Sequence, residues 1–593
     1  MPGDGLKWMD GNSLWGSELT KAVLNTSLPM ERLNDMTMRI VAAWYQVGQD
    51  DETKWPKDGR PNFSSWTDEE VGELHPGAPN SDETGVVNKF VQVRNTTEGG
   101  DHDALARRIA REGIVLVKNK DNLLPISRNG TDAAKAASKS GKLKVGVFGE
   151  GAFPNPKGPN ACKDRACNEY TLGSGWGSGA VEFPYLVSPV EALRREFDSE
   201  SIDLTEVKHN DDKHVDDVAA EQDMCLVFIN SDAGEGFTSW NGVRGDRNNL
   251  YAQKGGDVLV QKVAGNCDKT IVVIHTVGPL ILEKWIDLPG VKGVLIAHLP
   301  GQESGNALVD IMFGRAGPSG RLPYTIAKSE EDYGPDSGIM YYPNGVVPQQ
   351  NFSEGLYFDY RYLDKHDITP RYAFGYGLGY TTFELSSLNL QSSDLPSPLP
   401  AERPYPGPYH APNISTELPP PSSALFPEGF RKLQNYIYPY ITSVSEIQKG
   451  RYPYPSAYTS DPHPPSPAGG AQGGNPDLYA KAATVRATLS NLGHRSASSV
   501  VQLYISPPAN VVSAYTGQSV DMPIKVLRNW QKLYVEGEDS VQVDMEVTRK
   551  DISYWDVGAQ NWVVPQGTFT VWLGFSAGDL VLKGTFEGMV KEG

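Results

Sequence analysis

The sequence predicts a protein of the α/β class joined to an all-β domain, and two observations carry this prediction. Between residues 101 and 330, amphipathic helical segments alternate with apolar runs rich in β-branched residues. These runs are IVLVKN at 114–119, KVGVFG at 144–149, MCLVFIN at 224–230, TIVVIH at 270–275 and VKGVLIAH at 291–298. From residue 476 to 593, strand-like segments such as SVVQLYIS at 499–506 alternate with turns. Alternating helices and apolar runs indicate a largely parallel sheet that is covered on both faces. Short strands with a period of two indicate sheets with one buried face.

The amino-acid composition limits the partners that this protein can have. At 593 residues the chain has room for about three to four domains of ordinary size. Its 73 acidic and 54 basic residues give a formal net charge of −19, which argues against nucleic acid or an anionic membrane as a partner. No stretch approaches the roughly 20 apolar residues of a membrane span. Neutral ligands such as sugars remain compatible with this composition.

Residues 1–50 contain two helical patterns. A short amphipathic piece covers residues 19–24. The longer pattern opens with Ser27-Leu-Pro-Met-Glu31, which predicts a capping box with proline in the first turn, and it runs to about Tyr45. A helix pair this small cannot bury its apolar faces by itself. We therefore expect residues 1–50 to be the end of a larger domain, with apolar surface exposed on the longer helix.

The rest of the chain divides by changes in composition. Residues 51–100 are polar and rich in proline, which predicts a linker, and residues 101–330 form the α/β domain. The segment 331–385 alternates glycine and tyrosine and is expected to connect two domains. The insertion 386–475 is rich in Pro, Ser and Gly and should be mostly loop. The strands of 476–593 predict a β-sandwich of the fibronectin type III kind.

The stretch MCLVFINSDAGEGF at 224–237 joins an apolar run to a polar, glycine-rich loop. This pattern predicts a buried parallel strand that gives way to a loop at its carboxyl end, where α/β folds place their chemistry. Glu235 lies between two glycines, which let the backbone bring its carboxyl group close to a ligand. Beside Phe237 and Trp240 that carboxyl group would be partly desolvated, which raises its pKa and suits a general acid. On its own the pattern is more typical of a solvated turn.

Four cysteines in a chain of this length indicate two structural disulfides. We predict a bond between Cys162 and Cys167, which lie in one polar loop, and a bond between Cys225 and Cys267, which lie next to two predicted strands. The alternative is four free thiols in a cytosolic protein. No metal site is expected, because neither C-x-x-C nor H-E-x-x-H occurs.

Four long motifs of the chain carry a resemblance to a known family. They are SDAGEGF followed by GDRNNL, MPGDG followed by AVLNTSLPMERLNDM, TLGSGWGSGAVEFPYLVSP, and PRYAFGYGLGYTTF. Together they resemble glycoside hydrolase family 3, in particular its fungal β-glucosidase group. The resemblance implies that residues 1–50 are a remnant of a (β/α)8 barrel. An α/β/α sandwich with a largely parallel sheet and a fibronectin type III-like β-sandwich would follow it.

The resemblance also implies a function. Members of the group are retaining β-glucosidases that release terminal, non-reducing β-D-glucosyl residues during cello-oligosaccharide or polysaccharide breakdown. Two carboxyl groups roughly 5 Å apart act in such enzymes, one as nucleophile and one as acid and then base. By motif match Glu235 is the acid/base, and Trp176 and Ser178 are candidates for substrate contact or for the wall of the sugar site. No cofactor is implied.

The nucleophile implied by the resemblance is the Asp of an S-D-W motif in the barrel, and this sequence contains no S-D-W. We therefore expect the chain to be a truncated form of a longer enzyme and to be inactive, or nearly so, by itself. Three alternatives stay open. In the first, the chain is a non-catalytic fragment that binds carbohydrate or a partner. In the second, it complements a separately encoded barrel. In the third, the enzyme is a β-xylosidase or a broad β-glycosidase.

The expected partner is a β-glucoside or oligosaccharide substrate, and we allow for a homodimer. Secretion is expected from the resemblance alone, because Pro-Gly-Asp-Gly after Met1 does not open a signal peptide. Chance alone would give several N-glycosylation sequons in a chain of this size, so they are compatible with secretion without establishing it. The sequons lie at Asn25, Asn62, Asn95, Asn129, Asn351 and Asn413.

Overall fold

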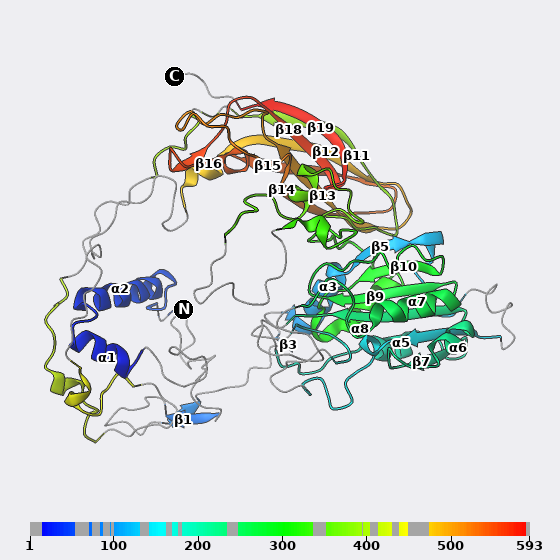
Figure 1. Ribbon diagram of the computed structural model, residues 1–593, viewed down its shortest axis with the longest axis horizontal. Coiled ribbons are helices and arrows are strands. Elements are labelled where there is room, and N and C mark those ends of the chain that lie inside the picture. The colour runs from blue at the N-terminus through cyan, green and yellow to red at the C-terminus, as the bar shows by residue number, and fades with distance from the viewer. Residues whose placement is uncertain are drawn as a thin grey trace. The chain divides into compact units, whose positions relative to one another are not determined.

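The fold is described from a computed structural model (Figure 1), in two compact units. One unit comprises residues 1–100 and 404–465, and the other comprises residues 101–403 and 466–593. Among the residues that the structure describes, no helix is long and apolar enough to cross a membrane. The described residues are 15–51, 53, 70–73, 84–86, 95–96, 100–130, 141–161, 169–175, 181–233, 247–335, 351–393, 395, 397–403, 413–429, 438–448 and 474–588.

A six-stranded sheet forms the centre of the second unit, with the strand order β5-β10-β9-β8-β6-β7. The five strands from β10 to β7 are parallel, and β5 pairs antiparallel with β10 at one edge. The largely parallel sheet that the sequence predicts is thus confirmed. The strands are β5 (Val115–Asn119), β6 (Leu143–Phe148), β7 (Ile202–Val207), β8 (Met224–Ser231), β9 (Thr270–Thr276) and β10 (Val291–Ile296).

Helices cover both faces of this sheet (Figure 1). One face packs against α3 (His102–Gly113), α5 (Pro189–Glu196) and α8 (Ser304–Met312), and the other packs against α6 (Val215–Ala220) and α7 (Gly256–Asn266). Alternate residues of each central strand enter the two cores, as the pleat of a strand requires. This layered packing is why the central strands consist almost entirely of apolar residues.

Strand β7 shows what an apolar-run pattern does not detect. Its sequence IDLTEV contains few apolar residues, and only its first and last residues are buried. It lies at the edge of the sheet, next to β6 alone. At this edge four of its six residues are not buried, so β7 needs fewer apolar residues than a central strand and its sequence resembles a loop.

The carboxyl-terminal part folds into two facing antiparallel sheets, β11-β12-β15 and β14-β13-β18-β19, around one core. The sequence prediction divided residues 383–392 between two segments, whereas β11 runs through all of them and pairs with β12. A small hairpin joins two further strands, β16 and β17. The strands are β11 (Phe383–Ser392), β12 (Lys481–Asn491), β13 (Ala497–Ser506), β14 (Val526–Val535), β15 (Ser540–Thr548), β16 (Tyr554–Asp556), β17 (Asn561–Val563), β18 (Thr568–Ser576) and β19 (Asp579–Glu587).

The segment that connects the α/β domain to the β-sandwich is held to the sandwich by the buried side-chain amide of Gln502. The Gln502 Nε2 atom donates to the carbonyl oxygens of Gly375, at 2.9 Å, and Phe575, at 2.7 Å. Gly375 has a φ of 80° and its Cα faces the Gln502 amide so closely that a Cβ would overlap it. Only glycine satisfies both conditions. In the same segment the rings of Tyr372 and Tyr376 stack, with their centroids 5.0 Å apart. Helix α9 (Tyr360–Lys365) precedes them in the chain.

In the first unit, α1 (Ser17–Leu24) and α2 (Met30–Gln46) confirm the two predicted helices. The capping box predicted at Ser27 is wrong, because Pro29 is the N-cap residue of α2 and the Ser27 hydroxyl donates to the Ala22 carbonyl at 3.1 Å. The chain turns back on α1 before α2 begins, so the serine completes that turn. Four short strands pair as β1 (Val71–Glu73) with β2 (Thr84–Val86) and β3 (Asn95–Thr96) with β4 (Gly100–Asp101).

Short 3-10 helices complete the described elements. They lie at Lys120–Asn122, Glu150–Ala152, Gly301–Glu303, Glu331–Tyr333, Pro421–Ala424, Val444–Glu446, Pro476–Tyr479 and Lys550–Ile552.

Candidate active site

The candidate site lies at the carboxyl end of β8, a central strand whose eight residues are all buried. At that end the apolar side chains stop, and three polar residues follow that remain buried: Asn230, Ser231 and Asp232, with at most 6% exposure. The apolar side chains of β8 pack into the cores on the two faces of the sheet. The polar residues lie at the edge of the sheet where loops follow parallel strands.

Two amides hold the backbone where the chain leaves β8. The Gln253 side chain accepts from the Asp232 backbone N–H at 3.2 Å and donates to the Asp232 carbonyl at 3.1 Å. The Gln253 backbone N–H donates to the Asn230 carbonyl at 2.9 Å. The Asn230 side chain donates to the Tyr170 carbonyl at 2.8 Å. The start of the loop that contains Glu235 is thus built on a fixed support.

Arg247, just past that loop, holds its other end. Its side chain is 7% exposed, and its Nη1 atom donates to the Pro279 carbonyl at 3.0 Å. Burial lowers the pKa of Arg247, and the nearby Tyr324, Tyr333 and Asp232 oppose this shift. Three residues later, the Leu250 backbone N–H donates to the Glu330 carboxylate at 2.7 Å. Sequence analysis gave Arg247 no role, although it is the arginine of the GDRNNL motif.

The residues that directly precede the two glycine-rich segments singled out in the sequence lie side by side. Gly175 directly precedes residues 176–180, and Ala233 directly precedes residues 234–246. A Cβ atom built on Gly175 would lie 3.8 Å from the Ala233 carbonyl oxygen, with Val277 and Leu299 at similar distances. The segments that contain Trp176 and Ser178, and Glu235, therefore start from adjoining points of the sheet edge.

Two histidines, His275 fully buried and His298 partly buried, line the same edge. The Nε2 atom of His275, on β9, lies 3.3 Å from the Ser304 hydroxyl, and the Nε2 atom of His298 lies 2.9 Å from the Tyr324 hydroxyl. Burial, with a contribution from His298, lowers the pKa of His275 to about 4, and burial also lowers the pKa of His298. Both rings are therefore neutral at pH 7. In the sequence each of these two histidines ends an apolar run, where a lone histidine is usually a core or rim residue, so neither was assigned a role.

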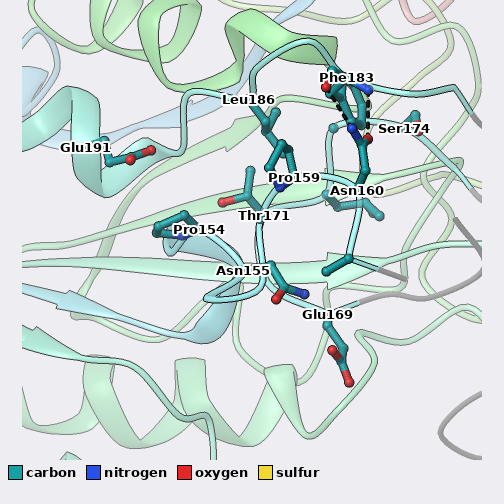
Figure 2. A pocket seen from close by; sticks show the side chains of 14 residues that line it. Pro154, Asn155, Pro159, Asn160, Glu169, Thr171, Ser174, Phe183, Leu186 and Glu191 are labelled. Atoms are coloured by element: carbon teal, nitrogen blue, oxygen red, sulfur yellow. Dashed lines mark hydrogen bonds between the residues drawn. The ribbon is translucent and has the colours of Figure 1, made fainter. Parts of the chain in front are cut away.

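A hollow of about 280 Å³ lies beside the first glycine-rich loop (Figure 2). Ala161, Glu169 and Ser174 are among the residues that line it. Asn160 and Phe183 join its sides, because the Asn160 amide donates to the Phe183 carbonyl and accepts from its backbone N–H, both at 2.8 Å. Amide, hydroxyl and carboxyl groups beside apolar side chains are the mixture found in small-molecule sites.

Five residues predicted for the site lie outside the described residues, so their roles stay predictions: Glu235, Trp176, Ser178, Cys162 and Cys167. The structure contains a disulfide between Cys225 and Cys267, with Cα atoms 6.4 Å apart. Of the sequons, Asn129, Asn351 and Asn413 are exposed and Asn25 is partly exposed. Only the backbone of Asn95 is described, and Asn62 is outside. Within the described residues, no cluster of three His, Cys, Asp or Glu side chains could hold a metal ion.

Comparison with protein families gives two matches. Residues 114–380 match the model of the glycosyl hydrolase family 3 C-terminal domain, and residues 499–577 match that of the fibronectin type III-like domain. These two matches confirm the α/β plus β fold predicted from the sequence. They cover the six-stranded sheet with its connecting segment and most of the β-sandwich.

Comparison with curated proteins finds long relatives. The chain is 50% identical to probable beta-glucosidase E of Neosartorya fischeri, over 99% of the chain and 57% of that protein. It is 45% identical to probable beta-glucosidase F of Emericella nidulans, over 95% of the chain and 61% of that protein. The chain therefore spans little more than half the length of these relatives.

Solved structures show the same relationship. A beta-glucosidase of Chaetomium thermophilum matches with a TM-score of 0.80 and 38% identity, over 98% of this chain and 67% of that one. A glycoside hydrolase family 3 beta-glucosidase of Neurospora crassa matches with a TM-score of 0.80 and 36% identity, over 97% and 66%. From these matches, the chain belongs to glycosyl hydrolase family 3.

Proposed function

We propose that this chain supplies the acid/base part of the active site of a retaining β-glucosidase, with Glu235 as the acid/base. The observation that supports this most is that the described residues on both sides of 234–246 are held in place, since Gln253 bonds to Asp232 and Arg247 bonds to the Pro279 carbonyl. A general acid must be held within hydrogen-bonding reach of the leaving group. Fixed loop ends at the middle of the sheet edge provide that restraint.

In this proposal Glu235 first protonates the glycosidic oxygen and then, as a carboxylate, deprotonates the water that hydrolyses the glucosyl-enzyme. The nucleophilic carboxylate comes from a segment outside these 593 residues, because the S-D-W motif does not occur here. The substrate is a terminal, non-reducing β-D-glucosyl residue of a cello-oligosaccharide. Trp176 and Ser178 contribute to the wall of the sugar site, because their loop starts beside that of Glu235.

The proposal also assigns the parts of the chain. Residues 1–50, with α1 and α2, are the end of a (β/α)8 barrel, and residues 51–100 link it to the α/β domain of 101–330. The segment that begins at residue 331 connects to the β-sandwich at β11, and the Pro/Gly-rich insertion follows β11 and ends near residue 475, before β12. The protein is secreted, as the resemblance implies.

The test is complementation. The 593-residue chain is co-expressed with the part of Neosartorya fischeri probable beta-glucosidase E that it does not span, and hydrolysis of 4-nitrophenyl β-glucoside is measured. We expect hydrolysis by the assembled protein and none by the chain alone. Comparing the rate with that on 4-nitrophenyl β-xyloside establishes the sugar preference.

Glu235→Gln in the assembled protein tests the assignment of the acid/base. Loss of general acid/base catalysis should lower the rate by about 10²- to 10⁴-fold. Azide should restore turnover of 2,4-dinitrophenyl β-glucoside and yield β-glucosyl azide, because azide needs no general base. Glu206→Gln, at the β7 edge, is the matched control and should leave the rate unchanged. An unaltered rate in Glu235→Gln would refute the assignment.

A further inference from the structure

A second cavity lies in the β-sandwich, apart from the sheet edge that contains the candidate active site. It has a volume of about 380 Å³, which is within the range of small-molecule sites. Its lining comes from β13, β14 and β18 of the sandwich (Figure 1), from the β16–β17 hairpin, from residues 520–523 and 551–553, and from α9. Helix α9 belongs to the segment that connects the two domains, so the cavity is formed where that segment packs against the β-sandwich.

Two guanidinium groups line the cavity, Arg361 of α9 and Arg528 of β14. The Nε atoms of both are buried and make no hydrogen bond to any described residue. Neither side chain forms an ion pair within the described part of the chain. Arg361 makes one long hydrogen bond, to the Leu356 carbonyl at 3.4 Å, and its guanidinium lies 4.7 Å from the Phe358 ring centroid.

The two acids of the cavity wall are engaged elsewhere. The Asp551 carboxylate accepts from the backbone N–H and the hydroxyl of Thr548, both at 2.7 Å. The Asp521 carboxylate accepts from the Tyr357 hydroxyl at 2.5 Å and lies 3.3 Å from the Lys365 ammonium. Burial lowers the pKa of Arg528; the negative charge of Asp551 opposes this shift, and the positive charge of Arg361 adds to it. The cavity therefore holds two cations with unused donors.

Most of the remaining wall is apolar, and two indole rings contribute to it. Trp555 of β16 and Trp562 of β17 meet edge to face, with ring centroids 5.7 Å apart. Trp555 is 42% exposed, so one side of the cavity is an accessible aromatic surface. Aromatic walls favour flat apolar rings. A neutral sugar could also place its C–H face on such a wall, but it carries no negative charge for the two guanidinium groups.

We propose that this cavity binds a planar aromatic carboxylate. The carboxylate would accept hydrogen bonds from Arg361 and Arg528, because guanidinium groups match carboxylate geometry. The ring would lie against Trp555 and Trp562. This site is independent of the proposed hydrolysis, because none of its residues belongs to the sheet edge that holds the Glu235 loop.

The test is calorimetric titration of the full chain with three probes. Cinnamate combines a ring and a carboxylate, cinnamyl alcohol has the ring without the charge, and glucuronate has the charge without an aromatic ring. We expect saturable one-to-one binding of cinnamate, with binding of each other probe about tenfold weaker or worse. Absence of cinnamate binding would overturn the proposal. Equal binding of glucuronate would also overturn it, because the aromatic wall would then have no role.

Variants then locate the site. Arg528→Gln and Arg361→Gln should each weaken cinnamate binding by about tenfold or more. Arg486→Gln is the matched control, because Arg486 lies on β12 of the same sandwich and pairs with Asp544 at 3.0 Å, away from the cavity. If cinnamate still binds to both cavity variants with unchanged affinity, its binding site lies elsewhere and the proposal is wrong. If these variants fail to fold, quenching of tryptophan fluorescence by the three probes in the unaltered chain decides the question.

Discussion

Helices α2 and α8 both carry apolar stripes, but their surroundings are opposite. Eight of the nine residues of α8 are buried. None of the 17 residues of α2 is buried in the described structure, and Ile40 is 72% and Tyr45 59% exposed. The apolar surface that the sequence predicted on α2 is thus confirmed.

The difference shows what an amphipathic pattern encodes. The period of 3.6 residues specifies a helix with one face that favours burial, but it does not specify the partner of that face. For α8 the partner is the six-stranded sheet together with α3 and α5. For α2 the proposed partner is the rest of a barrel. The following predictions test this contrast.

The largest expected effect in the buried core concerns its disulfide. Replacing Cys225 and Cys267 together by alanine should lower the free energy of unfolding of the α/β domain by about 4 kcal/mol, because the bond closes a loop of 42 residues. Chemical denaturation of the double variant measures this loss. If the double variant and the unaltered chain unfold at the same denaturant concentration, the bond does not form in solution.

Leu308→Ala tests the packing of α8. Leu308 is fully buried in the core between α8 and the sheet, so its truncation should cost about 2–5 kcal/mol through lost burial and the cavity left behind. The midpoint of urea unfolding should fall without a change in slope. A loss of no more than about 0.5 kcal/mol, the size expected for an exposed side chain, would contradict the packing.

A pH dependence should follow from His275, which contacts Ser304 at the start of α8. Its pKa is about 4 in the folded state and about 6.5 in an unfolded chain. Above pH 6.5 both states are neutral and stability is complete. As pH falls from about 6.5 to 4 only the unfolded state gains the proton, so stability declines. Melting temperatures across this range measure the decline.

His275→Gln keeps a donor for Ser304 and removes the titrating group. The decline in melting temperature between pH 6.5 and 4 should therefore become shallower, and His298 should account for part of what remains. An identical pH profile in the variant would show that His275 is not the group responsible.

The smallest expected effect is on α2. Ile40→Ala removes a side chain that is 72% exposed, and should change the free energy of unfolding by no more than about 0.5 kcal/mol. A loss as large as that of Leu308→Ala would mean that the face of α2 is covered in solution. In the assembly with the rest of the barrel we expect that larger loss, which makes Ile40→Ala a probe of barrel formation.

Prediction from the sequence succeeded where local pattern reflects burial. The runs at β6, β8, β9 and β10 are apolar because they enter two cores, so their positions were clear. Strand β7 was missed because an edge strand has less apolar surface, and β11 because its chain precedes a long insertion. The capping box failed because Ser27 completes a turn after α1 instead.

By itself the sequence determined which segments form α1, α2 and the central strands, and that Cys225 and Cys267 lie next to two of these strands. Each of these depends on residues that are near one another along the chain, or on the periodicity of burial. The tertiary structure alone decided that Arg247, His275 and Tyr324 share one sheet edge, and that Arg361 and Arg528 share a cavity with Trp555 and Trp562. Those groupings depend on strand order and on how the domain connection packs, which local sequence patterns do not specify.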